Sequence, residues 1–405
     1  MTKLLIGDCH ETLKSLEDQS INTVITSPPY FGLRDYGTAE WVGGDPNCDH
    51  IDRSKQGGGV DSKKQRTSVG TQNLQYQKVC SKCGSVRKDK QLGMEDTPEE
   101  FVDNLVAVFR EIKRVLRDDG TVWLNLGDSY AMSSMRGVKP KNLIGIPWRV
   151  AFALQQDGWY LRQDIIWHKP NPMPESVKDR CTKAHEYIFL LSKSPKYYFD
   201  NEAIKEEAKF PDGPNTPSSI KAVEGVYSAN LQKIGANNKR NKRSVWTVTT
   251  KPYKEAHFAT FPMDLIEPCV LAGCPEKICV DCGMPYKRIM QQPKPLEVKR
   301  GRRAGTDDRL IGGVLDKYKR ENPPIDLGLQ KQCDCKTNET KVGTVLDPFG
   351  GSGTTAQAAH KHGRDCVLCE LNADYVPLIE KRLNVGDIFM ELEVVNYAKK
   401  THSEA

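Results

Sequence analysis

The stretch TVLDPFGGSGTT, residues 344–355, decides the fold. It begins with a short apolar run that ends in Asp347, and three glycines then lead into two threonines and a helical run. An apolar strand that ends in a carboxylate and turns through glycines into a helix is typical of the ligand-binding edge of a doubly wound α/β sheet. The glycines allow a sharp turn and a close approach of the backbone to a bound molecule. The spacing matches neither G-x-G-x-x-G nor G-x-x-x-x-G-K-[ST], which argues against a dinucleotide-binding site and a P-loop.

A second carboxylate follows at the end of the next apolar run. Residues Val367–Cys369 are predicted to form a strand that ends in Glu370. Ligands of such sheets bind at the carboxyl ends of the strands, so Asp347 and Glu370 are expected to lie close together. Two acids on neighbouring strands suit a ligand with an amine and a ribose. That description fits S-adenosylmethionine.

A second motif lies near the N-terminus, where the apolar run Val24–Thr26 leads into Ser27-Pro28-Pro29-Tyr30. With these two motifs the sequence resembles the amino-group DNA methyltransferases, which methylate exocyclic nitrogens of cytosine or adenine. The catalytic motif of that family is (D/N/S)-P-P-(Y/F), and its cofactor motif is D-P-F-x-G-S-G-T-T. The catalytic motif comes first here, which is the permuted order of the β group. The resemblance covers about residues 4–383 apart from two insertions. It implies a mostly parallel, Rossmann-like sheet with helices on both faces.

The resemblance also implies which residues form the site. Catalytic roles fall on Ser27, Pro28, Pro29 and Tyr30. Asp8 is implied near the adenine of the cofactor, although an acid at that point also suits a helix N-cap. The other implied cofactor-binding residues are His257, Phe258, Asp347, Pro348, Phe349, Gly350, Gly351, Ser352, Gly353, Thr354 and Glu370.

The residue types of the Ser27–Tyr30 motif suit methylation of an amino group on a base. Such an amine is a poor nucleophile because its lone pair is delocalised into the ring, so the site must accept its hydrogen bonds. The Ser27 hydroxyl and the Pro28 carbonyl are suitable acceptors, and the two prolines fix the geometry of that carbonyl. Tyr30 offers a ring on which an extruded base can stack. Serine in the first position resembles the N4-cytosine enzymes most, so cytosine is the expected target and N6 of adenine is the alternative.

The composition indicates a soluble globular protein, and the cytoplasm is its expected location by default. Of 405 residues, 38% are hydrophobic and 28% are charged, and no stretch reaches the roughly 20 apolar residues of a membrane helix. The N-terminus MTKLLIGDCHETLK is too polar for a signal peptide. The net charge of +6 is mild, but basic residues gather at 239–243 and 287–303. Such clusters indicate either a solvated face or contact with nucleic acid.

The 13 cysteines are many for a cytosolic chain, where disulfides are rare and metal binding is the better explanation. Two sets of four residues have the spacing of closed tetrahedral zinc sites: Cys48, His50, Cys80 and Cys83, and Cys279, Cys282, Cys333 and Cys335. Unliganded surface cysteines are the alternative. The other cysteines are expected in the core or buried as small hydrophobes: Cys9, Cys181, Cys269, Cys274, Cys366 and Cys369.

The chain is predicted to be a permuted core with insertions. Residues 1–36 and 94–198 form the catalytic half in this interpretation, and residues 251–276 and 341–396 form the cofactor-binding half. Within the core, Thr97-Pro98-Glu99-Glu100 is a capping box that begins a helix reaching about Leu116. The remaining segments are a zinc-binding insertion at 37–93, a target-recognition region at 199–250, a second zinc-binding insertion at 277–340 and a tail at 397–405.

The implied substrate is double-stranded DNA. Its backbone is expected to contact basic side chains, namely Arg180, Lys239, Arg240, Lys242 and Arg243. The implied biological role is self-marking of DNA, either beside a cognate restriction endonuclease or in a phage or mobile element that evades restriction. One rival is a methyltransferase of RNA or of protein, which Ser27 and the permuted order disfavour. The other is a zinc-ribbon DNA-binding protein with an inactive core, which the two intact motifs disfavour.

Overall fold

The computed structural model describes residues 1–32, 38–50, 79–89, 91–131, 137–207, 239–251, 261–294, 296, 318, 321–384 and 391–397. A sheet of nine strands runs through this part of the chain, in the order β10-β6-β7-β5-β2-β15-β16-β1-β17. All neighbouring strands are parallel except for the two pairs that β7 makes, with β5 and with β6. The strands are β1 Thr2–Ile6, β2 Ile21–Thr26, β5 Leu116–Leu126, β6 Tyr160–His168, β7 His185–Ser192, β10 Val245–Thr247, β15 Thr344–Asp347, β16 Asp365–Glu370 and β17 Leu392–Asn396. This mostly parallel α/β sheet confirms the predicted fold class.

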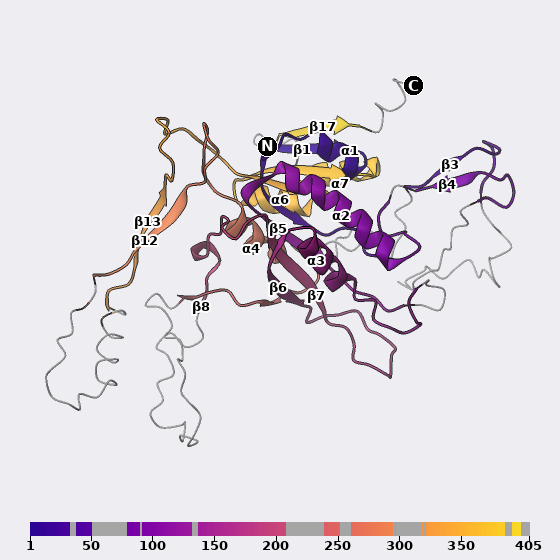
Figure 1. The fold of residues 1–405 in the computed structure, drawn as a ribbon, viewed down its shortest axis with the longest axis horizontal. Coiled ribbons are helices and arrows are strands. Elements are labelled where there is room, and N and C mark those ends of the chain that lie inside the picture. Colours follow the sequence, from indigo (N-terminus) through magenta and orange to yellow (C-terminus); the bar gives the residue numbers. More distant parts are fainter. Residues whose placement is uncertain are drawn as a thin grey trace, which may run out of the picture.

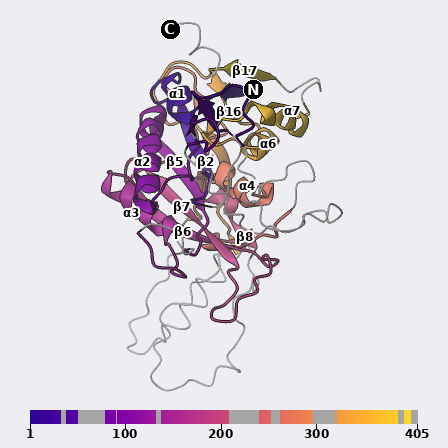
Figure 2. The ribbon, with the colours of Figure 1, turned by 90° about the vertical axis from the view of Figure 1, so that its right-hand side faces the viewer.

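Helices cover both faces of the sheet, as Figure 2 shows. Side chains of β2 alternate between the faces, so Val24 belongs to one apolar cluster and Ile25 to the other. The first cluster packs against α1 Cys9–Lys14, α2 Pro98–Val115 and α3 Ile146–Gln156. The second packs against α4 Met263–Gly273, α6 Thr354–Lys361 and α7 Val376–Arg382, which follows the short 3₁₀ helix η3 Ala373–Tyr375. Because both faces are covered, β2 is buried along its whole length.

Helix α2 forms where its capping box predicts it. The Glu100 N–H donates to the Thr97 hydroxyl at 3.2 Å, and the Glu100 carboxylate accepts from the Asp96 N–H at 3.1 Å. These two bonds satisfy backbone donors that have no partner within the first turn. The apolar side chains of α2 are buried at helical spacing, from Phe101 through Leu105 to Ile112.

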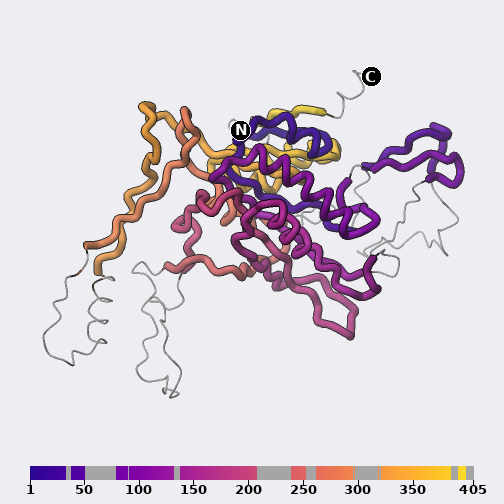
Figure 3. The backbone as a smooth tube through the Cα atoms, in the orientation of Figure 1, coloured from indigo at the N-terminus to yellow at the C-terminus, as the bar shows by residue number. Residues whose placement is uncertain are grey.

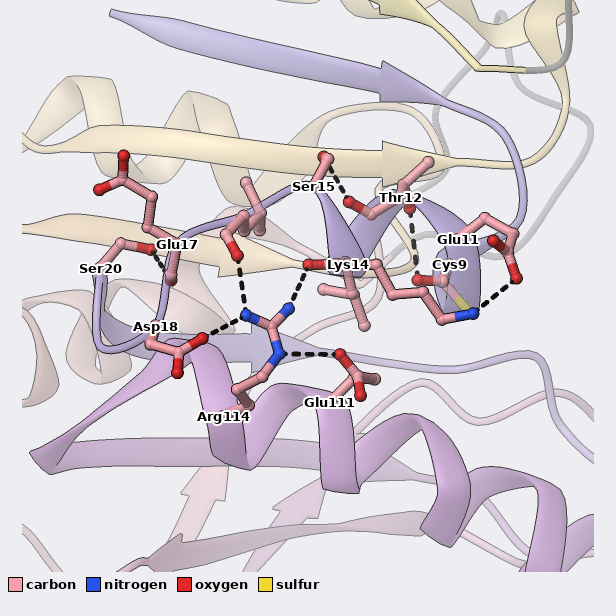
Figure 4. A network of polar contacts seen from close by, with 12 residues as sticks. Cys9, Glu11, Thr12, Lys14, Ser15, Glu17, Asp18, Ser20, Glu111 and Arg114 are labelled. Carbon is pink, nitrogen blue, oxygen red and sulfur yellow. Dashed lines mark hydrogen bonds and ion pairs between the residues drawn. The ribbon is translucent and has the colours of Figure 1, made fainter. Parts of the chain in front are cut away.

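Arg114, near the end of α2, holds the connection between α1 and β2 (Figure 4). Its guanidinium donates to the carbonyls of Leu13 and Leu16, both at 2.9 Å. It also pairs with Asp18 at 2.6 Å and with Glu111 at 3.0 Å. One side chain thus fixes the turn that leads the chain into β2, the strand that carries the Ser-Pro-Pro-Tyr motif at its end.

Two ribbons project from the core on opposite sides (Figures 1 and 3). One pairs β3 Glu40–Val42 with β4 Val86–Lys88, and the other pairs β12 Lys287–Gln291 with β13 Ile325–Gln330. Two shorter pairs join β8 Glu206–Glu207 to β9 Lys239–Arg240 and β11 Ile278–Cys279 to β14 Thr340–Lys341. The 3₁₀ helix η2 Glu202–Ile204 precedes β8.

Three details differ from the sequence interpretation. Strand β10 lies inside the segment 199–250, where no strand is predicted, and β17 adds an edge strand beside β1. Both are short, with mixed exposure, so periodicity does not reveal them. Cys181 is exposed, and its predicted burial is wrong, whereas Cys9, Cys269, Cys274, Cys366 and Cys369 are buried as predicted. Among the helices of the described ranges, none is long and apolar enough to cross a membrane.

The contacts of Arg114 predict a measurable loss of stability when its charge is removed. Arg114→Met keeps the apolar stem but loses the bonds to two carbonyls and two carboxylates, so unfolding should become easier by about 1–2 kcal/mol. Arg110→Met is a matched control on the same helix, because the Arg110 side chain is 66% exposed and pairs only with Asp157 among the described contacts. Chemical denaturation of both variants checks the prediction, and equal stability of the two would contradict it.

Candidate active site

The two sequence motifs meet at one edge of the sheet. Strands β2 and β15 are parallel neighbours, with Val345 beside Thr23 and Leu346 beside Val24. Their carboxyl ends, Thr26 and Asp347, therefore lie side by side. Helix α6, which follows β15, packs on one face of the sheet, and α2, which follows β2, packs on the other. A crevice between such diverging connections is where open α/β sheets bind their ligands.

Asp347 ties the two motifs together. Its carboxylate accepts from the hydroxyls of Thr26 and Thr355, each at 2.6 Å, and from the N–H of Phe349 at 3.1 Å. The side chain is buried, and this burial raises the pKa of Asp347 to about 6, against the effect of the three donors. These hydrogen bonds fix the loop that follows Asp347. The predicted contact of Asp347 with a cofactor stays a prediction.

The loop after Asp347 needs its glycines for close packing. The N–H of Gly350 donates to the Cys369 carbonyl at 2.7 Å, and a Cβ at Gly350 would lie 3.1 Å from Cβ of Leu368. Gly353 is the N-cap of α6 with φ +81°, a conformation that favours glycine. The loop is thereby pressed against β16. Ser352 is buried here, and its hydroxyl has no hydrogen-bond partner within the described part of the chain.

Glu370 and Asp8 stand at the ends of the next two strands. The Glu370 carboxylate accepts from the N–H groups of Gly351 at 2.7 Å and Asn372 at 2.9 Å, and burial raises the pKa of Glu370 to about 7. The Asp8 carboxylate accepts from the His10 N–H at 2.9 Å, so Asp8 caps α1, as the N-cap interpretation predicts. Its contact with a cofactor stays a prediction. His257 and Phe258 lie outside the described residues.

The Ser-Pro-Pro-Tyr motif follows β2, and its tyrosine is held by residues of β5 and β7. The Tyr30 hydroxyl donates to Glu186 at 2.7 Å and lies 3.2 Å from the amide oxygen of Asn125. The Ser27 hydroxyl is 3.4 Å from the same phenol oxygen. A Cβ at Gly127 would lie 2.5 Å from the Tyr30 ring, so the glycine makes room for that ring. Pro28 is buried, and Pro29 is half-buried.

Glu186 is in turn paired with Lys169. The Lys169 ammonium donates to Glu186 and lies 4.2 Å from the centre of the Trp167 ring. Because β7 is antiparallel to β5 and β6, its first residues lie at the edge where the other two strands end. No sequence signal shows that Asn125 and Glu186 bind the Tyr30 hydroxyl.

Four of the five basic residues predicted to contact DNA already have partners within the chain. Arg180 pairs with Glu175 at 2.6 Å and lies 3.8 Å from the centre of the Tyr130 ring. The Glu206 carboxylate accepts from the guanidinium groups of Arg240 and Arg243. The Lys242 ammonium lies 5.0 Å from the centre of the Trp246 ring. Lys239 is exposed. The predicted contact of these residues with DNA stays a prediction.

The structure brings together both predicted metal-ligand sets. In each set, one ligand atom per residue lies within 4.8 Å of every other. In the first set, Cys48 and Cys80 sulfurs are 3.8 Å apart, and Cys83 sulfur is 3.6 Å from Nδ1 of His50. Neighbouring sulfurs of a tetrahedral site with Zn–S bonds of about 2.3 Å lie about 3.8 Å apart. The donor sets Cys₃His and Cys₄ therefore fit a structural zinc ion.

Each set contains a matching backbone turn. The N–H of Gly84 donates to the Cys80 carbonyl at 2.9 Å, and the N–H of Gly283 donates to the Cys279 carbonyl at 2.9 Å. Both glycines have positive φ, +74° and +68°. These turns bring the two cysteines of each Cys-x-x-Cys pair to one side, as a metal site requires.

The sequence matches a family model and several known proteins. Residues 21–282 and 335–381 match the family model described as DNA methylase. The type II methyltransferase M.SmaI of Serratia marcescens is 34% identical over 402 residues, covering 94% of this chain and 90% of that protein. M.Cfr9I of Citrobacter freundii, also a type II methyltransferase, is 33% identical over 406 residues, covering 95% and 88%. Among solved structures, the cytosine-N4-specific PvuII DNA methyltransferase has a TM-score of 0.49 at 17% identity, covering 96% of this chain and 88% of that one.

The chain therefore belongs to the family of amino-group DNA methyltransferases. This confirms the resemblance carried by the two motifs.

The ligand sets predict a metal content. Elemental analysis of the purified protein should find about two zinc ions per chain, one for each closed four-ligand site. Replacing both Cys279 and Cys282 by serine should reduce this to about one, while the first site keeps its metal. A zinc-free protein with the same thermal stability as the metal-treated protein would contradict the prediction.

Proposed function

We propose that this chain transfers a methyl group from S-adenosylmethionine to the exocyclic amine of a base in DNA, at a specific site, with N4 of cytosine as the target. One observation carries the proposal. Ser27 and the glycine loop follow two neighbouring parallel strands, β2 and β15, whose ends are joined by the hydrogen bond from Thr26 to Asp347. The target N6 of adenine is the alternative, because that amine needs the same acceptors.

The residues of the catalytic motif have distinct roles in this proposal. The Ser27 hydroxyl and the Pro28 carbonyl accept hydrogen bonds from the amine, which directs its lone pair towards the methyl group. The Tyr30 ring stacks on the extruded base, and its hydroxyl is fixed by Glu186, so the stacking surface is preorganised. The bound donor supplies an electrophilic methyl group. Proximity and orientation of donor and acceptor then account for most of the acceleration.

The cofactor side of the crevice is proposed as follows. The carboxylate of Glu370 accepts hydrogen bonds from the ribose hydroxyls, and Asp8 lies near the adenine. The loop Pro348–Thr354 borders the methionine part, together with His257 and Phe258. Support comes from the resemblance to the family and from the shared edge on which Glu370 and the loop stand.

The wider surface is proposed to bind double-stranded DNA. Arg180 and the cluster Lys239–Arg243 contact phosphates after exchanging their present acidic partners, and the two projecting ribbons extend the contact area. The type II relatives support a role in self-marking of DNA, with a cognate endonuclease as the partner. In this proposal the enzyme acts in the cytoplasm, where its substrate lies.

A nucleoside analysis tests the proposed reaction. Purified protein is incubated with DNA of mixed sequence and labelled S-adenosylmethionine, and the digested nucleosides are identified by mass spectrometry. N4-methylcytosine is the expected product. N6-methyladenine would support the alternative target, and a product found only on RNA or protein would overturn the proposed substrate. Failure to bind the cofactor would favour a DNA-binding protein with an inactive core.

The raised pKa of Glu370 predicts a pH dependence of cofactor binding. Because its pKa is about 7, the carboxyl is mostly neutral at pH 6 and mostly ionised at pH 8. Only the ionised form can accept bonds with both oxygens from a ribose. Affinity for S-adenosylmethionine should therefore rise as the pH increases through about 7.

Glu370→Gln provides the control for this dependence. It should bind the cofactor more weakly, and the rise should be absent. Titration of the cofactor itself is common to both proteins, so calorimetry at several pH values isolates the contribution of Glu370 as a difference. Parallel pH curves for the two proteins would remove Glu370 from the cofactor site.

A further inference from the structure

Lys183 is a half-buried lysine whose ammonium group has no hydrogen-bond partner in the described part of the chain. The Nζ of Lys183 is shielded from solvent and makes no hydrogen bond within the described ranges. An ammonium group in such a place is costly unless an acceptor reaches it. Burial lowers the pKa of Lys183, while the charges of Asp128 and Glu186 act in the opposite direction. A buried donor without a partner calls for an explanation, and an acceptor on a ligand would provide one.

Lys183 stands at the ligand edge of the sheet. It precedes β7 by two residues, and the carbonyl of its neighbour Ala184 accepts from the Lys169 N–H at 2.8 Å. Three residues further on, Glu186 holds the Tyr30 hydroxyl. The lysine therefore lies beside the group of residues that positions the stacking ring.

The neighbouring cations differ from Lys183 in a way that matters. Lys169 already pairs with Glu186, and Arg180 already pairs with Glu175. Lys141 pairs with Asp179 at the surface, where its side chain is 84% exposed and within reach of a phosphate. The Lys183 ammonium points into the protein, so a DNA phosphate outside is a poor match. An acceptor on an extruded base that enters the site is a better one.

The two candidate bases differ at one position that a donor can read. When the amine of cytosine lies at Ser27, the ring continues through the acceptor N3 to the carbonyl oxygen O2. When the amine of adenine lies there, the ring continues through the acceptor N1 to a C2–H group. A donor at this position thus favours cytosine, because adenine would leave it without an acceptor.

We propose that Lys183 donates a hydrogen bond to O2 of the flipped target cytosine and so selects cytosine over adenine. The inference rests on the proposed function, since it assumes that the amine of a flipped base lies at Ser27. In this arrangement Ser27 and Pro28 accept from one end of the base edge, and Lys183 donates to the other.

A double-mutant cycle tests the proposal with the full-length enzyme, with one change made in the protein and the other in the target base. The recognition sequence is first read from DNA methylated by the wild-type protein. Two duplexes are then compared, one with the target cytosine and one with a 2-aminopyridine C-nucleoside, which keeps the amine and the adjacent ring nitrogen but lacks O2. Transfer of the labelled methyl group is measured for the wild-type protein and for Lys183→Met.

The wild-type rate should fall by about tenfold or more when O2 is removed, and Lys183→Met should fall by a similar factor on cytosine. The rate of Lys183→Met should fall little further when the analogue replaces cytosine, because both changes remove the same hydrogen bond. Its affinity for S-adenosylmethionine should equal that of the wild type. Lys14→Met, at an exposed lysine of α1 paired with Glu11, is the matched control and should behave as wild type on both duplexes.

Other outcomes overturn specific parts. If the rate losses from removing O2 and from Lys183→Met multiply, Lys183 does not act on O2. The proposal then fails, while methyl transfer to cytosine stands. If the wild-type enzyme produces only N6-methyladenine, the selection by Lys183 is wrong and the amine-directed chemistry remains. If no DNA base is methylated although the cofactor binds, the proposed function itself fails.

Discussion

The arrangement of the site depends on a single buried carboxylate. Asp347 accepts from Thr26, which is 321 positions away in the sequence, and from Thr355 in the first turn of α6. Thr26 directly precedes Ser27 of the catalytic motif, and Thr355 lies in the helix that follows the glycine loop. Asp347 therefore holds both motifs at once. Hydrogen bonds to a buried carboxylate are strong because little water competes for it. Small movements of either motif are therefore resisted by the other.

A second constraint comes from the direction of β7. If β7 ran parallel to β5 and β6, its last residues would lie at the ligand edge of the sheet. Its first residues would then lie at the opposite edge. The antiparallel pairing of β7 with β5 and β6 instead brings Lys183 and Glu186 beside the ends of those strands. The edge thereby gains a carboxylate and an ammonium in addition to the polar groups of β2, β15 and β16. Charge at the proposed base pocket is thus a consequence of strand direction.

The sequence predicted what depends on local pattern and on motifs. The parallel sheet follows from apolar runs that end in Asp347 and Glu370, and α2 follows from its capping box. The two ligand sets follow from their spacing, although His50 and Cys80 are separated by residues outside the described ranges. Contacts between distant side chains could not be predicted, because no local pattern near Glu186 or Asn125 indicates a contact with Tyr30. The same holds for the hydrogen bonds of Asp347 with Thr26 and Thr355, since no local pattern shows that Asp347 joins the two motifs.

The two insertions illustrate how segments can be added to such a sheet without disturbing it. None of the residues of β3, β4, β12 and β13 is fully buried, so neither ribbon buries enough apolar surface to be stable alone. The buried residues of the insertions include Cys80 and Cys279, one from each ligand set. A metal ion that fits each set would provide the folding free energy that a core cannot. Because all four ligands of a set belong to one insertion, each insertion can be stabilised internally while the core keeps its nine-stranded sheet.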